Sequence, residues 1–247
     1  MIHISDLTFS YTQGTHKKSI FRGLDLHIKR GEFLTIVGKS GTGKSTFLKM
    51  LAGILSPENG TLQLDGNPII PGSAGYMPQK DLLLPRKTVC ENMRLSEVLM
   101  KHHQIKDETI DELLALSGLT VYANAYPDEL SGGMRQRVAF LRTLLTGKDL
   151  LLLDEPFAAL DSLTKRDMQK WLLRLWEDSG KTIVFVTHDL EEALFLSDRI
   201  YIMEQDCASR KEILIPFSRP RESLIRFSKA FIDLRIQLEE VLANESE

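Results

Sequence analysis

The chain has 247 residues, a length at which one large domain can bury a substantial core. Hydrophobic residues make up 43% of it and charged residues 26%, close to the averages for water-soluble domains. The formal net charge of -3 provides no broad basic field, so we expect no nucleic-acid binding. Composition therefore indicates an ordinary α/β or α+β domain.

Cysteine content and apolar runs argue against an exported or membrane-spanning chain. Cys90 and Cys207 are too few for a disulfide scaffold and are not spaced as a metal site. The first residues have neither the basic nor the apolar region of a signal peptide, so we expect no export. No apolar run approaches the ~20 residues that a spanning helix needs. Any membrane process would be reached through a partner.

The first third of the chain has the alternating pattern of half-buried antiparallel strands. Apolar and polar residues alternate over 24–28 and 61–64, with glycine and Asn-Gly breaks between these segments. Residues 33–37 are instead a continuous apolar run ending in glycine, and helical spacing follows over 44–52. We expect a small antiparallel β region beside a fully buried strand, a tight loop and a helix.

The middle of the chain predicts a helical insertion followed by a parallel sheet. From Thr88 to Leu119 the apolar spacing is helical, and we expect His102 and His103 there to be solvated. Buried strands over 150–153 and 182–186 then alternate with helices over 162–176 and from Asp189. The expected core is therefore α/β. The apolar pattern of the insertion comprises Val98, Leu99, Ile105, Ile110, Leu113, Leu114 and Leu116.

After Glu204 the pattern changes, and we expect residues 206–247 to form a C-terminal extension. Pro216 and Pro220 indicate a linker, and apolar residues then recur with the spacing of one amphipathic helix. Its polar face carries glutamates rather than a basic stripe, so packing on the domain or on a second copy is expected. The apolar residues are Leu224, Phe227, Phe231, Leu234, Leu238 and Val241, and the glutamates are Glu239, Glu240 and Glu245.

Residues 38–45 read GKSGTGKS and fit the phosphate-binding pattern G-x-x-x-x-G-K-[ST] between a strand and a helix. The glycines let backbone amides face phosphate oxygens, and the helix N-terminus adds partial positive charge. Lys44 would bridge the β- and γ-phosphates, and Ser45 would ligate Mg²⁺. The expected nucleotide-contacting residues are Gly38, Ser40, Gly41, Gly43, Lys44, Ser45 and Thr46.

Asp154 and Glu155 end the buried strand over 150–153, where α/β folds bind their ligands. Asp154 is suited to hold Mg²⁺, directly or through water, and Glu155 to accept a proton from an attacking water. Alone, such a pair is also compatible with an exposed turn. Together with the phosphate loop, it predicts a nucleoside-triphosphate hydrolase.

Residues 130–137, LSGGMRQR, indicate the class of hydrolase. A serine followed by two glycines at the start of an apolar-periodic helix is a second anion-binding helix end. From about Phe9 to Met203 the chain resembles the nucleotide-binding domain of ABC transporters, and this string matches that family's signature motif. The resemblance implies a head-to-tail homodimer, in which Ser131, Gly132 and Gly133 contact the γ-phosphate held by the other copy.

The resemblance also implies the fold and the remaining site residues. The fold would be a P-loop NTPase (RecA-like) parallel-sheet core within residues 1–205, with a small antiparallel β subdomain and an inserted α-helical subdomain at about 82–146. Tyr11, or Phe9 in its place, would stack on adenine, and Asp161 would cross the dimer seam or simply cap a helix. His188 would contact the γ-phosphate. The implied catalytic set is Lys44, Gln79, Glu155 and His188, and the metal ligands are Ser45, Gln79 and Asp154.

Within the family, residues 154–161, 188–193 and 219–221 most resemble bacterial importer ATPases for nitrate, sulfonate, taurine or a thiamine-precursor pyrimidine. This implies ATP and Mg²⁺ as cofactors and separate integral membrane permease subunits at the cytoplasmic face of the membrane. A periplasmic or lipoprotein solute-binding protein would take part indirectly. Lys39, Thr42 and residues 140–141 depart from the subgroup pattern, but none of them is a phosphate-contacting position of the family.

Three alternatives stay open at this point. A soluble ABC ATPase of translation or DNA repair usually has tandem domains or a long coiled-coil insertion, which the short segment 82–128 lacks. A P-loop kinase would not need residues 130–137. An exporter often has its membrane-spanning and ATPase segments fused in one chain, and we expect no membrane-spanning segment here.

Overall fold

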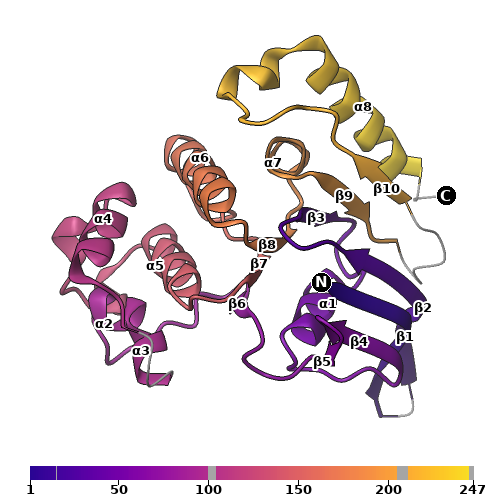
Figure 1. The fold of residues 1–247 in the computed structure, drawn as a ribbon, viewed down its shortest axis with the longest axis horizontal. Coiled ribbons are helices and arrows are strands. Elements are labelled where there is room, and N and C mark those ends of the chain that lie inside the picture. Colours follow the sequence, from indigo (N-terminus) through magenta and orange to yellow (C-terminus); the bar gives the residue numbers. More distant parts are fainter. Residues whose placement is uncertain (15, 100–103, 205–210, 245–247) are drawn as a thin grey trace.

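The computed structural model describes residues 1–14, 16–99, 104–204 and 211–244. Figure 1 shows two sheets with helices around them. Among the described residues, no helix has both the length and the apolarity needed to cross a bilayer.

The strands are β1 (Ile2–Gln13), β2 (His16–Ile28), β3 (Phe33–Val37), β4 (Asn59–Leu64), β5 (Asn67–Pro68), β6 (Gly75–Met77), β7 (Leu150–Asp154), β8 (Thr182–Val186), β9 (Arg199–Ile202) and β10 (Lys211–Leu214). The α-helices are α1 (Lys44–Leu51), α2 (Val89–Met93), α3 (Leu95–Leu99), α4 (Asp107–Leu116), α5 (Gly132–Leu144), α6 (Ser162–Ser179), α7 (Leu190–Leu196) and α8 (Lys229–Asn244). Short 3-10 helices are η1 (Thr120–Tyr122), η2 (Pro127–Glu129) and η4 (Ser223–Phe227).

The strand order confirms the predicted α/β class. The small sheet is antiparallel, in the order β2-β1-β4-β5. The large sheet has the order β10-β9-β3-β8-β7-β6, in which β9 to β6 run parallel and β10 is antiparallel to β9. Every residue of β3, β7 and β8 is buried, as continuous apolar runs between two helical layers require.

The register of the large sheet brings the sequence motifs to one edge. Ile36 of β3 pairs with Val186 of β8, and Val186 pairs in turn with Asp154 of β7. The carboxyl ends of these parallel strands therefore coincide, and the three loops that follow them lie together. This edge is where open α/β sheets bind their ligands.

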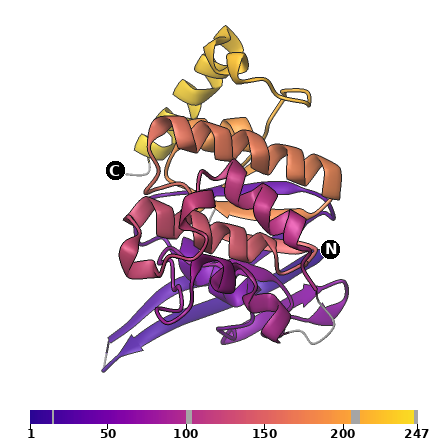
Figure 2. The same cartoon turned by 90° about the vertical axis from the view of Figure 1, so that its left-hand side faces the viewer.

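The large sheet separates two hydrophobic cores because successive side chains of a strand point to opposite faces. In β3, Leu34 and Ile36 join the core that α1 forms with the antiparallel sheet, while Phe33 and Val37 join the core on the other face. Helices α5, α6 and α7 contribute to that second core. Figure 2 shows the long helix α6 running across the face opposite the antiparallel strands.

The insertion expected after Thr88 is helical, although its apolar pattern was only partly right. Thr88 caps α2 in a capping box with Glu91, and α2 packs on α5. Val98, counted in the apolar pattern, is 76% exposed. It lies in the separate five-residue helix α3 and so is out of register with the buried face of α4. His102 and His103 lie outside the described residues.

The C-terminal segment differs from the prediction in two ways. Strand β10 was not predicted, and it extends the large sheet beside β9. Leu224 and Phe227 were assigned to the amphipathic helix, but they lie in η4 and are each 71% exposed. The helix itself begins at Lys229, after Ser228 accepts a hydrogen bond from the backbone N–H of Phe231. Phe231 and Leu238 are buried, and α8 packs on α7 as Figure 1 shows. Cys207 and Glu245 lie outside the described residues.

Candidate functional site

The loop between β3 and α1 forms one wall of a cavity of about 520 Å³. The Lys44 ammonium is buried and donates to the backbone carbonyls of Gly38 and Lys39, each at 2.7 Å, so the loop wraps around it. Gly43 has φ 104°, and a Cβ there would lie 2.5 Å from Cγ2 of Ile20, so only glycine fits. The lining includes the expected loop residues Gly38, Ser40, Gly41, Gly43, Lys44, Ser45 and Thr46.

The antiparallel sheet supplies the side of this cavity. The Tyr11 hydroxyl lies 3.3 Å from Oγ1 of Thr46, and the Tyr11 ring is half-exposed toward the cavity. Phe9 instead packs edge-on against Tyr11 at 5.0 Å and is not part of the lining, which favours Tyr11 for the stacking position. Lys18 and Ile20 also line the cavity, and sequence reasoning missed both. Lys18 pairs with Tyr11 across β1 and β2.

Asp154 lies at the end of β7, and its side chain accepts a hydrogen bond from Ser45. Burial raises the pKa of Asp154 above its ordinary value, although the bond from Ser45 and the charge of Lys44 act in the opposite direction. Burial likewise lowers the pKa of Lys44, against the attraction of Glu155 and Asp154. A carboxylate and a hydroxyl in contact at the phosphate loop offer the oxygen ligands that Mg²⁺ prefers.

The buried charge at Asp154 has a consequence for stability. Because the folded protein binds this proton more tightly than the unfolded chain, Asp154 favours folding below pH 3.8 and opposes it above the raised pKa. Asp154→Asn should therefore raise the unfolding temperature of the nucleotide-free protein at pH 7. The rise is about 2–4 °C for each kcal/mol by which the substitution increases the free energy of unfolding. Thermal unfolding between pH 7 and pH 4 measures this, with the gain shrinking as the pH falls. Asp149→Asn, at an exposed aspartate just before β7, is the control, and an equal gain there would contradict the assignment.

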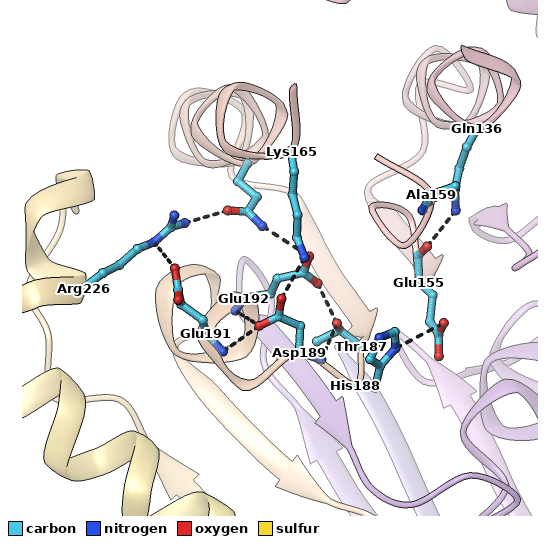
Figure 3. A network of polar contacts seen from close by, with 11 residues as sticks. Gln136, Glu155, Ala159, Lys165, Thr187, His188, Asp189, Glu191, Glu192 and Arg226 are labelled. Atoms are coloured by element: carbon cyan, nitrogen blue, oxygen red, sulfur yellow. Dashed lines mark hydrogen bonds and ion pairs between the residues drawn. The ribbon is translucent and has the colours of Figure 1, made fainter. Parts of the chain in front are cut away.

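Glu155 has an unusual backbone conformation that directs its carboxylate into the cavity. Its φ is 51°, a region that costs a non-glycine residue about 1–3 kcal/mol and recurs at functional sites. Its N–H donates to the carbonyl of Val186 at 2.9 Å. Its Oε2 lies 3.4 Å from both Nε2 of Gln79 and Nδ1 of His188. Figure 3 shows His188 facing Glu155 from the next loop. The structure thus brings all four residues expected to be catalytic, Lys44, Gln79, Glu155 and His188, to one cavity.

The signature string lies elsewhere. Ser131 is the N-cap of α5, and its hydroxyl accepts from the N–H of Met134 at 3.3 Å. Within the described part of the chain, the lining of the phosphate-loop cavity contains none of Ser131, Gly132, Gly133 and Asp161. Asp161 is exposed and caps α6 through the N–H groups of residues 163 and 164. The two helix ends that the sequence predicts to bind anions thus lie in separate places in one chain.

Gln136, which sequence reasoning missed, joins these two regions. Its Nε2 donates to the carbonyl of Glu155 at 2.8 Å, and its Oε1 accepts from the N–H of Ala159 at 2.9 Å (Figure 3). A Cβ at Gly133 would lie 2.7 Å from the Ala159 carbonyl, so this glycine allows the close approach. The start of α5 is therefore tied directly to the loop that follows Glu155. The only sequence signal was a polar residue on the buried face of the helix.

Comparison with known proteins decides the family. A sequence profile described as ABC transporter matches residues 21–158. The chain belongs to the ABC transporter family. It is 39% identical to the formylaminopyrimidine import ATP-binding protein ThiZ of Halalkalibacterium halodurans, over 100% of this chain and 98% of that protein. It is 42% identical to the nitrate import ATP-binding protein NrtD of Synechococcus elongatus, over 81% of this chain and 75% of that protein.

A solved structure supports the same fold for this ABC chain. It is described as the dimeric structure of a post-hydrolysis state of the ATP-binding cassette MJ0796 bound to ADP and Pi. The TM-score is 0.80 at 31% identity, over 88% of this chain and 100% of that one. The protein is accordingly an ATP-binding ABC ATPase.

Proposed function

We propose that this chain is the ATP-hydrolysing subunit of an importer, working as a homodimer on separate integral membrane permease subunits at the cytoplasmic face of the membrane. One observation carries the proposal: Ser131 and its glycines lie outside the cavity formed by the phosphate loop of the same chain. A helix N-terminus favours an anion, and a second copy arranged head to tail would bring its bound phosphate to this one. The dimeric ABC cassette with 31% identity supports a dimer.

Each composite site would then hold ATP and Mg²⁺. Tyr11 stacks on adenine, and the loop amides with Lys44 bind the phosphates. Ser45 and Gln79, which line the cavity, and Asp154, which contacts Ser45 from the end of β7, would hold Mg²⁺. Mg²⁺ binds through one or two side chains together with phosphate oxygens.

Hydrolysis needs a base beside the γ-phosphate, and Glu155 takes that role in our proposal. Its carboxylate accepts the proton of the attacking water, while Gln79 and His188, each 3.4 Å away, orient the water and the γ-phosphate. Bound Mg²⁺ would neutralise charge that develops on the phosphate oxygens. Loss of the γ-phosphate removes what the partner's signature helix recognises, and the dimer opens. ATP therefore shifts the population between closed and open dimers, and this motion acts on the permease.

The proposed substrate is nitrate, a sulfonate, taurine or a thiamine-precursor pyrimidine. ATP-binding subunits of importers for solutes of this group are similar to most of this chain. A solute-binding protein outside the membrane would deliver the solute to the permease. The alternative of a soluble ABC ATPase unconnected with transport has no observation in its favour.

Ser131→Arg tests the head-to-tail dimer. The arginine should block approach of the partner's γ-phosphate region, so ATP-dependent dimerisation and turnover are lost while each chain still binds ATP. Size-exclusion chromatography with ATP, phosphate release and nucleotide binding measure the three effects. Ser179→Arg, at the exposed last residue of α6, is the matched control. Full turnover by a strictly monomeric protein at every concentration would overturn the proposal.

A further inference from the structure

A chain of buried polar contacts runs from the C-terminal segment toward the candidate site, and it begins at Arg226 of η4. This side chain is only 7% exposed, and its guanidinium lies 4.0 Å above the ring of Phe195 in α7. It donates to Oε1 of Gln169 at 2.6 Å, and its Nε is 3.3 Å from Oε1 of Glu191. Arg226 thereby joins the C-terminal segment to α6 and α7 (Figure 3).

Gln169 in turn contacts the buried carboxylate of Glu192. Its Nε2 donates to Oε1 of Glu192 at 3.3 Å, and both side chains are buried. The same carboxylate pairs with the Lys165 ammonium at 2.6 Å and accepts from the Thr187 hydroxyl at 2.6 Å. Burial raises the pKa of Glu192, while the bonds from Lys165 and Thr187 oppose that rise. A buried amide such as that of Gln169 is costly to leave without partners, so the network favours one arrangement.

The far end of the network is the loop that carries His188. Oγ1 of Thr187 accepts from the N–H of Asp189 at 3.0 Å, and the Asp189 carboxylate pairs with Lys165 at 2.7 Å. The residues on both sides of His188 are therefore fixed by groups that contact Glu192. The imidazole itself is 68% exposed and meets Glu155 at 3.4 Å, so its position depends on the backbone beneath it. Figure 3 shows these side chains converging on the loop between β8 and α7.

We infer that Gln169 and Arg226 are positioning residues for His188, and that the C-terminal segment controls ATP turnover through them. This inference rests on the proposed function, in which His188 acts beside Glu155. A contact that lifts η4 from α6 and α7 frees Gln169, loosens Glu192, and lets the His188 loop leave its catalytic position. ATP binding is largely retained, because the phosphate loop and Lys44 stay in place and, of this network, only His188 lines the phosphate-loop cavity. Turnover and ATP affinity should therefore separate.

The first test compares two arginines of the same segment in the full-length chain. Arg226→Met keeps an apolar contact with Phe195 but removes the bond to Gln169, and we expect kcat to fall about fivefold while the Kd for ATP changes much less. Arg226→Lys keeps the cation and should recover part of the loss. Arg235→Met is the control, since Arg235 is half-exposed and pairs with Glu239 on α8. An unchanged kcat in Arg226→Met would overturn the inference.

A double-mutant cycle with His188→Ala shows whether the effect passes through the histidine. If it does, Arg226→Met lowers kcat in the native background and changes nothing further in His188→Ala. Additive losses would mean that Arg226 acts elsewhere and would overturn the inference. Normal turnover in His188→Ala would instead remove His188 from the proposed mechanism, so the two failures can be told apart. Gln169→Leu, which preserves buried volume, gives the same reading if Arg226→Met folds poorly.

Discussion

Glu155→Gln should abolish ATP turnover while ATP binding survives. The amide has the shape of the carboxylate but cannot accept a proton, and loss of a general base costs about 10²–10⁴-fold in rate. The backbone should stay in place, because the Glu155 N–H and carbonyl are held by Val186 and Gln136 whatever the side chain is. Without hydrolysis the γ-phosphate persists, so the variant should accumulate as an ATP-stabilised dimer. Phosphate release and size-exclusion chromatography with ATP measure the two effects.

Glu58→Gln makes the same chemical change at a surface glutamate paired with Lys17, and it should leave turnover unchanged. Unchanged phosphate release in Glu155→Gln would remove Glu155 from the base role. A variant that lost both turnover and ATP binding would indicate damage to the cavity instead.

The parts of this molecule that were predictable from sequence are those that local chemistry determines. The burial of 33–37, 150–153 and 182–186 follows from continuous apolar runs, and the structure has strands there with the expected bounds or one residue more. Helix α6 runs three residues beyond its predicted end at Trp176, because Gly180 ends it in the left-handed conformation. The conformation of the phosphate loop is likewise local, because the loop's own glycines allow it.

The parts that sequence reasoning missed depend on contacts distant in the chain. Lys18 reaches the cavity only because β1 and β2 pair in one particular register. Gln136 bonds to residues about twenty positions away, and Arg226 reaches Gln169 at a separation of 57. Strand β10 has four residues and only its partner β9 defines it. Periodicity reports which face of an element is apolar but not which distant group a buried polar side chain meets.

Lys44→Ala should weaken ATP binding itself, in contrast to Glu155→Gln. The buried ammonium is the cation within the loop, and removing a partner of a desolvated charge pair costs about 3 kcal/mol, or roughly a hundredfold in Kd. In the structure this ammonium donates to the carbonyls of Gly38 and Lys39, and bound phosphates would compete for its protons. Equilibrium binding of ATP by isothermal titration calorimetry measures the change, and thermal unfolding checks that the fold persists.

Lys39→Ala separates the specific role of Lys44 from charge in general. Both variants remove one positive charge from the same loop, but the Lys39 side chain is exposed and outside the cavity lining. If affinity came from the net charge of the loop, the two variants would lose it equally, and the loss would shrink in salt with a Debye length of about 8 Å. We expect Lys39→Ala to bind ATP almost normally. Normal ATP affinity in Lys44→Ala would contradict the phosphate-loop assignment, because no other described ammonium lies buried within that loop.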